Sequence, residues 1–186
     1  ILVADGVAGV EQVDRAWMGN CKAPMGPFGM MDLFGLDLVY DQMHQDQPNP
    51  QLDELRQRAI PLIGARVEQG ELGQKTGKGF YSYPAPAYEQ PGFLDGLEKV
   101  RECYESLLAA LVQSAGLIAL NEVARPADID RAWMIGTGLG AGPFGMLESM
   151  GMAEYERIIS QARKSLRLVP DEEAQQVQDW LEAYCR

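Results

Sequence analysis

Histidine and cysteine are scarce in this sequence, and neither forms a cluster. The 186 residues include one His and three Cys. The cysteines, Cys21, Cys103 and Cys185, are 82 residues apart and form no CxxC pair. Structural zinc sites need ligands at short, regular spacings, and secreted disulfide scaffolds carry an even number of cysteines. The sequence therefore predicts no metal site and no disulfide framework, and it favours a reduced, cytoplasmic location.

Basic residues and long apolar runs are also few. Sixteen Lys and Arg face 27 Asp and Glu, giving a net charge of −11, and the acidic residues are spread along the chain. Such a chain offers no positive patch to a nucleic-acid backbone or an anionic membrane. No stretch approaches the ~18 uninterrupted apolar residues of a membrane span. The 46% apolar residues suffice for a packed core, so we expect a globular protein of one domain or two small ones.

Recognisable catalytic motifs are absent as well. The chain has no GxGxxG, no nucleophile elbow and no zinc signature. We therefore predict no catalytic, cofactor-binding or metal-binding residue in it. It opens at Ile1-Leu2-Val3 without Met or a charged leader, and we expect it to be a piece of a longer protein.

What the sequence does contain is an internal repeat. D-R-A-W-M begins at Asp14 and again at Asp130, and G-P-F-G-M begins at Gly26 and again at Gly142. Both pairs are separated by 116 residues, which is far longer than the period of a solenoid. We interpret the repeat as a tandem duplication of a small domain with a join near Pro91-Gly92. The predicted domains are residues 1–96, truncated at the N-terminal end, and residues 97–186.

Helical periodicity dominates both copies. Apolar residues recur every three or four positions from Leu97 to Leu120, the pattern of a long core-facing helix. Pro27, Pro126 and Pro143 are suited to the first position of further helices. We predict an all-α fold in which two small helical bundles pack as a pseudo-dimer, with only Phe80–Tyr83 extended. Other helices are expected at 37–46, 51–69, 152–167 and 170–184.

Several residues invite a chemical interpretation beside a structural one. The run from Gly73 to Gly79 fails the spacing of a phosphate-binding P-loop, but its lysines could lie near an anionic ligand, or its glycines could simply let Phe80 and Tyr81 pack. His44 fits a structural role better than that of a base. Asp32 and its counterpart Glu148 could form an acid–base pair or occupy related structural positions. The Met-rich stretch that begins at Met25 is typical of core, or of an adaptable wall for an acyl chain.

Four segments of the first copy carry a family resemblance. They are V-E-Q-V-D-R-A-W from Val10, P-M-G-P-F-G from Pro24, D-x-x-G-L-D from Asp32, and K-T-G-K-G-F-Y from Lys75. Together they resemble the C-terminal domain of 3-hydroxyacyl-CoA dehydrogenases, and the second copy resembles the second such domain of longer family members. The second copy departs from this pattern in three ways. It has Glu122 where the family commonly has Gly, it has L-G-A-G-P-F from Leu139 in place of P-M-G-P-F, and it lacks the K-T-G-x-G-F-Y run.

The resemblance implies a place in NAD-dependent oxidation of 3-hydroxyacyl-CoA to 3-ketoacyl-CoA in fatty-acid breakdown (β-oxidation). In that family an upstream Rossmann domain binds NAD and supplies the catalytic residues, and the helical domain closes the substrate cleft and makes subunit contacts. The implied partners are thus acyl-CoA and the upstream domain, with a weakly bound second copy of the chain as a further candidate, while the chain alone is inactive. The substrate-binding candidates are Met25, Phe28, Lys75 and Lys78.

Two other functions remain open, a stand-alone acyl-CoA-binding module and a structural dimerisation domain. For the assembly we expect the two copies to pair about a pseudo-two-fold axis through a surface that includes the helix 97–120. Trp17 and Trp133 should then have equivalent packing environments.

Overall fold

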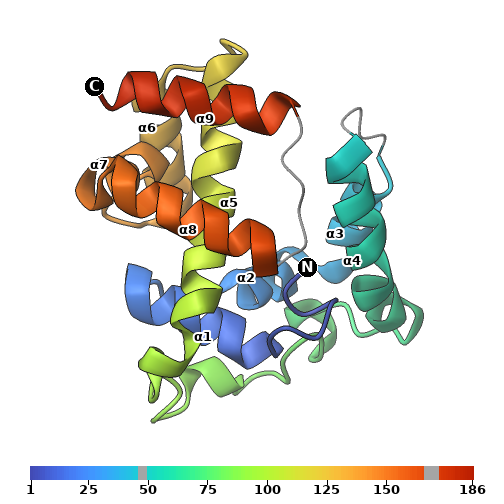
Figure 1. Ribbon diagram of the computed structural model, residues 1–186. Coiled ribbons are helices and arrows are strands. Elements are labelled where there is room, and N and C mark those ends of the chain that lie inside the picture. The colour runs from blue at the N-terminus through green and yellow to red at the C-terminus, as the bar shows by residue number, and fades with distance from the viewer. Residues whose placement is uncertain (46–49, 166–171) are drawn as a thin grey trace. The chain divides into compact units, whose positions relative to one another are not determined.

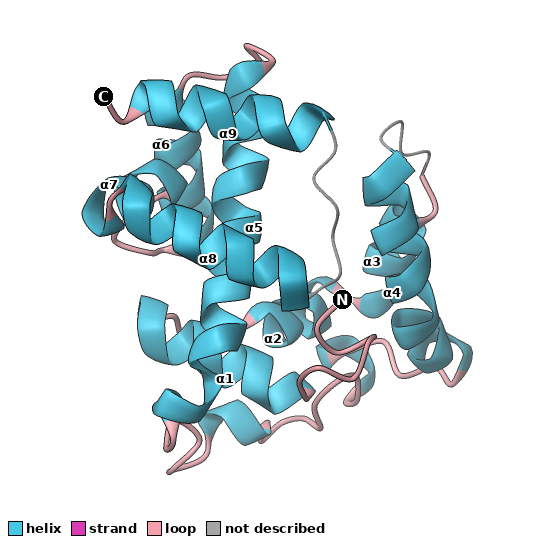
Figure 2. Cartoon of the chain, viewed as in Figure 1, coloured by secondary structure: helices cyan, strands magenta, loops and turns pink. Residues whose placement is uncertain are grey.

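The computed structural model describes residues 1–45, 50–165 and 172–186, and its regular secondary structure there consists of helices joined by loops and turns (Figures 1 and 2). No strand occurs among these residues, which confirms the all-α prediction. Short 3₁₀ turns connect some of the helices. The α-helices are α1 (Val10–Cys21), α2 (Pro27–Phe34), α3 (Leu36–Met43), α4 (Pro50–Glu68), α5 (Arg101–Leu120), α6 (Pro126–Thr137), α7 (Pro143–Met150), α8 (Met152–Ser165) and α9 (Glu172–Tyr184). The 3₁₀ turns are η1 (Gln74–Thr76), η2 (Ala87–Glu89) and η3 (Leu97–Val100).

The chain divides into two compact units, Ile1–Cys103 and Tyr104–Arg186. This division falls seven residues after the predicted domain boundary, inside the first turn of α5. The predicted helix 97–120 begins as the 3₁₀ turn η3 and becomes α-helical at Arg101. The other predicted helices agree with the structure to within a few residues wherever their bounds are described. Residue 46 of the helix expected at 37–46, residues 166–167 of the one expected at 152–167 and residues 170–171 of the one expected at 170–184 lie outside the described residues.

Three helices begin where proline predicted. Pro27, Pro126 and Pro143 each occupy the first turn of α2, α6 and α7. Proline is favoured there because its fixed φ suits the helix and its missing N–H would have had no intrahelical acceptor. The sequence signal for these three starts is therefore local and reliable.

Left-handed turns recur at the 116-residue offset. Gly6 and Glu122 have φ 70° and 55°, and Lys22 and Gly138 have φ 54° and 70°. At the first pair the turns close with the same hydrogen bonds, Val7 N–H to Leu2 O and Val123 N–H to Ile118 O. This six-to-one bond is the mark of a Schellman motif at a helix C-terminus. The repeated backbone geometry agrees with the predicted duplication and makes residues 1–6 the end of a helical turn.

Unit 1 buries one side of α1 and packs α3 against α4. Val13, Ala16 and Trp17 of α1 are buried. The contact between α3 and α4 is close at Gly64, where an added Cβ would lie 2.9 Å from the Tyr40 ring. Figure 1 shows α3 and α4 side by side. A glycine inside α4 therefore has a packing reason, although it weakens the helix by itself.

Unit 2 is built around α5. Its core contains Val112, Phe144, Leu147 and Tyr155, from α5, α7 and α8. Gly116 lets α9 approach α5, since an added Cβ would lie 2.7 Å from Val177. By length and composition α5 is the one helix in the described ranges that could cross a membrane, with a mean hydropathy of 1.5. Its packing in this core accounts for that apolar character equally well.

Candidate functional site

The first element of the site is a carboxylate that caps a distant helix. Asp14 on α1 accepts hydrogen bonds from the backbone N–H groups of Phe28 (2.8 Å) and Gly29 (2.9 Å), in the first turn of α2. The residue before this helix, Gly26, has no side chain to cap it, and an added Cβ there would lie 2.4 Å from Asp14 Cα. The carboxylate thus satisfies two helix N–H groups that would otherwise have no acceptor.

Unit 2 repeats this arrangement. Asp130 on α6 accepts N–H bonds from Phe144 and Gly145, each of 2.8 Å, and an added Cβ on Gly142 would lie 2.4 Å from Asp130 Cα. The duplicated motifs D-R-A-W-M and G-P-F-G-M are therefore the two sides of one contact. Our sequence analysis missed this role for Asp14 and Asp130, and the signal was the constant spacing of aspartate and glycine in both copies.

A second carboxylate holds the glycine-rich turn of unit 1. Asp32, buried at the end of α2, accepts bonds from the backbone N–H groups of Phe80 and Tyr81, both 2.9 Å, and from the Tyr83 hydroxyl at 3.0 Å. Gly73 and Gly79 make room for it, because an added Cβ would lie 2.2 Å from Asp32 O or 2.1 Å from Asp32 Oδ1. We call the segment Gly73–Tyr83 the clip.

Tyrosine links the two carboxylates. The Tyr81 hydroxyl donates to Asp14 Oδ2 at 3.0 Å. Burial raises the pKa of Asp14 to about 6, although the hydrogen bonds from Phe28, Gly29 and Tyr81 act in the opposite direction. Burial and the adjacent Asp14 carboxylate raise the pKa of Tyr81, which remains a protonated donor at neutral pH. This buried network fixes the clip to α1 and α2, and it is closed to solvent at Asp14.

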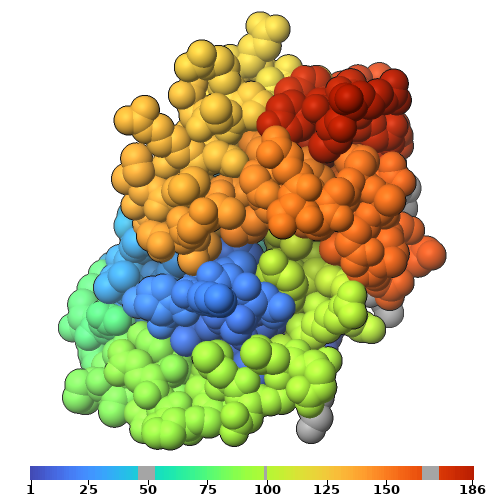
Figure 3. Space-filling view, turned by 90° about the vertical axis from the view of Figure 1, so that its left-hand side faces the viewer, coloured from blue at the N-terminus to red at the C-terminus, as the bar shows by residue number. Residues whose placement is uncertain are grey.

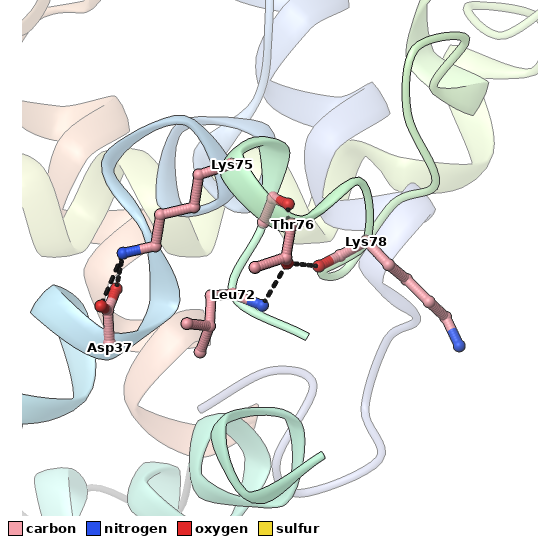
Figure 4. Close-up of polar contacts among 6 residues, drawn as sticks. Asp37, Leu72, Lys75, Thr76 and Lys78 are labelled. Atoms are coloured by element: carbon pink, nitrogen blue, oxygen red, sulfur yellow. Dashed lines mark hydrogen bonds and ion pairs between the residues drawn. The ribbon is translucent and has the colours of Figure 1, made fainter. Parts of the chain in front are cut away.

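The two lysines of the clip lie at the surface and are both ion-paired. Lys75 Nζ lies 2.6 Å from both carboxylate oxygens of Asp37, and Lys78 Nζ lies 2.5 Å from Glu71 Oε1. The hydrogen bond from Lys75 lowers the pKa of Asp37. Figure 4 shows the two lysine side chains leaving the turn in opposite directions, with Thr76 between them. The positive charge of each clip lysine is therefore largely balanced by its neighbouring carboxylate.

The two apolar candidates lie on the inner side of the clip. Phe28 is buried and meets Phe80 edge to face, with 4.6 Å between ring centroids. The Arg66 guanidinium lies 4.2 Å from the centroid of that Phe80 ring. Met25, just before α2, is half-buried. The structure thus brings Phe28 against the clip that carries both lysines, but Phe28 is a packing residue here.

The remaining candidates have structural contacts of their own. His44 ends α3, where Nδ1 lies 2.8 Å from Tyr40 O and the two rings pack at 4.3 Å. Glu148 accepts a 2.9 Å hydrogen bond from the Tyr184 hydroxyl. Asp32 and Glu148 therefore each receive a tyrosine hydroxyl within their own unit. No group of three potential metal ligands occurs in the described part of the chain.

Comparisons with known proteins agree with this organisation. A family model described as 3-hydroxyacyl-CoA dehydrogenase, C-terminal domain, matches residues 1–83 and 104–186. A 3-hydroxybutyryl-CoA dehydrogenase from Mycobacterium tuberculosis is 40% identical over 85 residues, which cover 44% of this chain and 28% of that protein. A probable 3-hydroxyacyl-CoA dehydrogenase from Caenorhabditis elegans is 42% identical over 81 residues, 42% of this chain and 26% of that protein. The matched part of the chain thus covers less than a third of the length of these relatives.

A solved structure extends the similarity to nearly the whole chain. The crystal structure of 3-hydroxybutyryl-CoA dehydrogenase from Escherichia coli K12 superposes with a TM-score of 0.63 over 98% of this chain and 57% of the other. At 16% identity this likeness concerns the fold alone.

Proposed function

The chain belongs to the family of 3-hydroxyacyl-CoA dehydrogenase C-terminal domains, and on that premise we propose that it forms the substrate-cleft and assembly region of an NAD-dependent enzyme of this kind. The reaction is the oxidation of a 3-hydroxyacyl-CoA to a 3-ketoacyl-CoA. NAD and the catalytic residues belong to an upstream nucleotide-binding domain of the same protein, and the chain by itself is inactive.

The observation that carries this proposal is the family match over both units, combined with the construction of the clip. Two buried aspartates, Asp14 and Asp32, hold the clip by its backbone and by two tyrosines, so its position is fixed before any ligand binds. A preorganised surface loop costs little entropy when it contacts a substrate. We assign the substrate contact to unit 1, because the clip and its two exposed lysines belong to it.

Within the clip, the exposed lysines are the groups that can reach an anionic CoA. Lys75 and Lys78 would exchange Asp37 and Glu71 for substrate phosphate, so each contact gains only the difference between two exposed ion pairs. Phe28 packs against Phe80 of the clip. Of the two apolar candidates, Met25 is the more exposed to solvent, because it is half-buried and Phe28 is buried. We therefore expect the lysines to tune acyl-CoA affinity modestly.

The activity is tested with a fusion protein. The nucleotide-binding part of the Mycobacterium tuberculosis 3-hydroxybutyryl-CoA dehydrogenase is joined to residues 1–186, and reduction of NAD by 3-hydroxybutyryl-CoA is followed by absorbance. We expect turnover by the fusion and none by the chain alone, which should also fail to quench or enhance NADH fluorescence. Saturable NADH binding by residues 1–186 would contradict the proposal. A folded fusion that binds NADH but shows no turnover would also contradict it.

The lysines are tested in the same fusion. Lys75→Glu combined with Lys78→Glu should raise the KM for acyl-CoA about fivefold and leave the KM for NAD unchanged. Lys22→Glu combined with Lys164→Glu is the matched control, because it changes the net charge equally at exposed positions outside the clip. An equal rise in the KM for acyl-CoA in both double variants would assign the effect to overall charge.

A further inference from the structure

Helix α4 contains three arginines, and one of them is not paired with a carboxylate. Arg56 pairs with Asp53, and Arg58 pairs with Asp5. Arg66, in the last turn of the helix, has no ion pair within the described residues of unit 1. An arginine side chain offers five N–H donors and keeps its charge in proteins. Arg66 therefore has a positive charge that no neighbouring carboxylate balances.

The contacts that Arg66 does make hold its guanidinium against the clip. Its Nε donates to the Gly79 carbonyl at 3.3 Å, and its Cζ lies 4.2 Å from the centroid of the Phe80 ring. The same ring packs edge to face against Phe28, with 4.6 Å between the centroids. The backbone N–H of Phe80 is bound by Asp32. Because α2 holds the ring in this way, the ring in turn fixes the orientation of the guanidinium.

These contacts occupy Nε and one face of the guanidinium, and they leave Nη1 and Nη2 for another acceptor. The side chain of Arg66 is half-buried, and unlike Nε and Nη1 of Arg56 these two nitrogens are not enclosed without a partner. Paired N–H groups of a guanidinium match two oxygens of one phosphate group. A guanidinium that is already held in place loses less conformational entropy when it makes such a contact.

Arg66 contacts the end of the clip that contains Lys78. Gly79, whose carbonyl it binds, directly follows Lys78. The Arg66 carbonyl accepts the N–H of Glu71 at 3.0 Å, and Glu71 is the residue that pairs with Lys78. Figure 3 shows the segment around residues 65–80, in green, at the surface. A phosphate at this end can bind Arg66 directly, whereas Lys78 must first leave Glu71.

We propose that the Arg66 guanidinium binds a phosphate group of the acyl-CoA substrate through Nη1 and Nη2. The inference rests on the proposed function, because it requires the clip to face the substrate, and it adds a residue outside the clip. The phosphate meets a cation without a competing carboxylate, so this contact contributes more to affinity than the exchange of an ion pair at either clip lysine. A thioester without phosphate gains nothing from Arg66.

The test compares two substrates in the fusion of the nucleotide-binding part with residues 1–186. They are 3-hydroxybutyryl-CoA and the 3-hydroxybutyryl thioester of N-acetylcysteamine, which has no phosphate. Arg66→Met keeps the length of the side chain and removes its charge and donors. It should raise the KM for the CoA thioester about tenfold, the scale of a charge-assisted hydrogen bond. The kcat, the KM for NAD and the kcat/KM for the N-acetylcysteamine thioester should not change.

Two further variants serve as controls. Arg66→Lys keeps the charge without the paired donors and should recover part of the loss, for a KM about threefold above that of the unaltered fusion. Lys22→Met removes one exposed charge of unit 1 outside the clip and should leave all values unchanged. An equal loss with both thioesters would make Arg66 a structural residue only, and a raised KM for NAD would assign it to the cofactor. Either result, or an unchanged KM for the CoA thioester, would overturn the proposal.

A titration of the full 186-residue chain decides the question if Arg66→Met does not fold or the fusion shows no turnover. The Nε–H resonance of Arg66 is followed by NMR and assigned by its loss in Arg66→Lys. It should shift saturably with CoA and stay unchanged with pantetheine, which has no phosphate. No shift with CoA, or an equal shift with NAD, would overturn the inference. A saturable shift with CoA beside an inactive unaltered fusion would support the inference and contradict the proposed function alone.

Discussion

At the scale of single residues, each of the two units has glycine at one left-handed position where the other unit has a residue with a side chain. At the 116-residue offset Gly6 corresponds to Glu122 and Lys22 corresponds to Gly138, and all four have φ between 54° and 70°. A side chain at such a φ costs about 1 to 2 kcal/mol because Cβ approaches the carbonyl oxygen. Each unit therefore carries one strained helix end that the other unit avoids. The sequence identified Glu122 as a departure from the family pattern, and the dihedral angle gives the reason for the usual glycine.

We predict that Glu122→Gly stabilises the protein. Relief of the left-handed strain should exceed the extra freedom that glycine gives the unfolded chain, for a net gain of about 0.5 to 1 kcal/mol. Urea unfolding followed by circular dichroism measures the change. Gly6→Ala is the reverse control and should lose a similar amount. A loss of stability in Glu122→Gly would show that the Glu122 side chain contributes more than the strain costs.

The buried Asp14 gives a pH dependence that can be measured. Its pKa is raised from 3.8 to about 6, so the folded state binds the Asp14 proton more tightly than the unfolded chain does. The free energy by which tighter proton binding at Asp14 stabilises the folded state has its full value below the ordinary pKa, and it is lost as the pH rises through about 6. We predict that the free energy of unfolding of the wild type, relative to Asp14→Asn, falls by about 3 kcal/mol at most between pH 4 and 7.

Unfolding in urea at a series of pH values tests this for both proteins. Tyr81→Phe removes the hydroxyl that donates to the Asp14 carboxylate and should move the transition to higher pH. Parallel pH profiles for wild type and Asp14→Asn would refute the assignment.

At the scale of the elements, the helix starts were predictable and their caps were not. Pro27, Pro126 and Pro143 mark their helices from within the first turn, because proline acts locally. Asp14 and Asp130 cap α2 and α7 from another helix, 14 residues before the first N–H group they accept. Local capping rules consider only the adjacent residue. The role of Asp32 could not be predicted for the same reason. The N–H groups that it accepts, on Phe80 and Tyr81, are 48 and 49 residues away in the sequence.

We predict that Gly142→Ala strongly destabilises unit 2. The new Cβ would lie 2.4 Å from the backbone of Asp130, so α6 and α7 must separate and the two capping bonds must weaken. The loss should be about 2 to 4 kcal/mol. Gly140→Ala is the matched control two residues earlier, where an added Cβ meets nothing within 4 Å, and it should be neutral. Similar melting temperatures for the two variants would argue against the close contact.

At the scale of the whole molecule, the sequence predicted the fold class and the repeat but could not predict how each copy is covered. The expectation of equivalent surroundings for Trp17 and Trp133 was wrong, because Trp17 is buried and Trp133 is half-buried. The two tryptophans lie in identical pentapeptides, so the difference arises outside the motif. In unit 1 residues 87–100 lie on α1, and coverage of this kind depends on contacts distant in sequence.

The pairing of the two units about a pseudo-two-fold axis stays a prediction, and coupled unfolding tests it. A protein with Trp133→Phe and Trp180→Phe reports on unit 1 through Trp17 alone. If the units share an interface, Gly142→Ala in unit 2 should also lower the urea midpoint seen by Trp17, because loss of one partner exposes the other. Gly140→Ala should not. Independent units would leave the Trp17 transition unchanged while circular dichroism records the loss of unit 2, and the predicted pseudo-dimer would then be wrong.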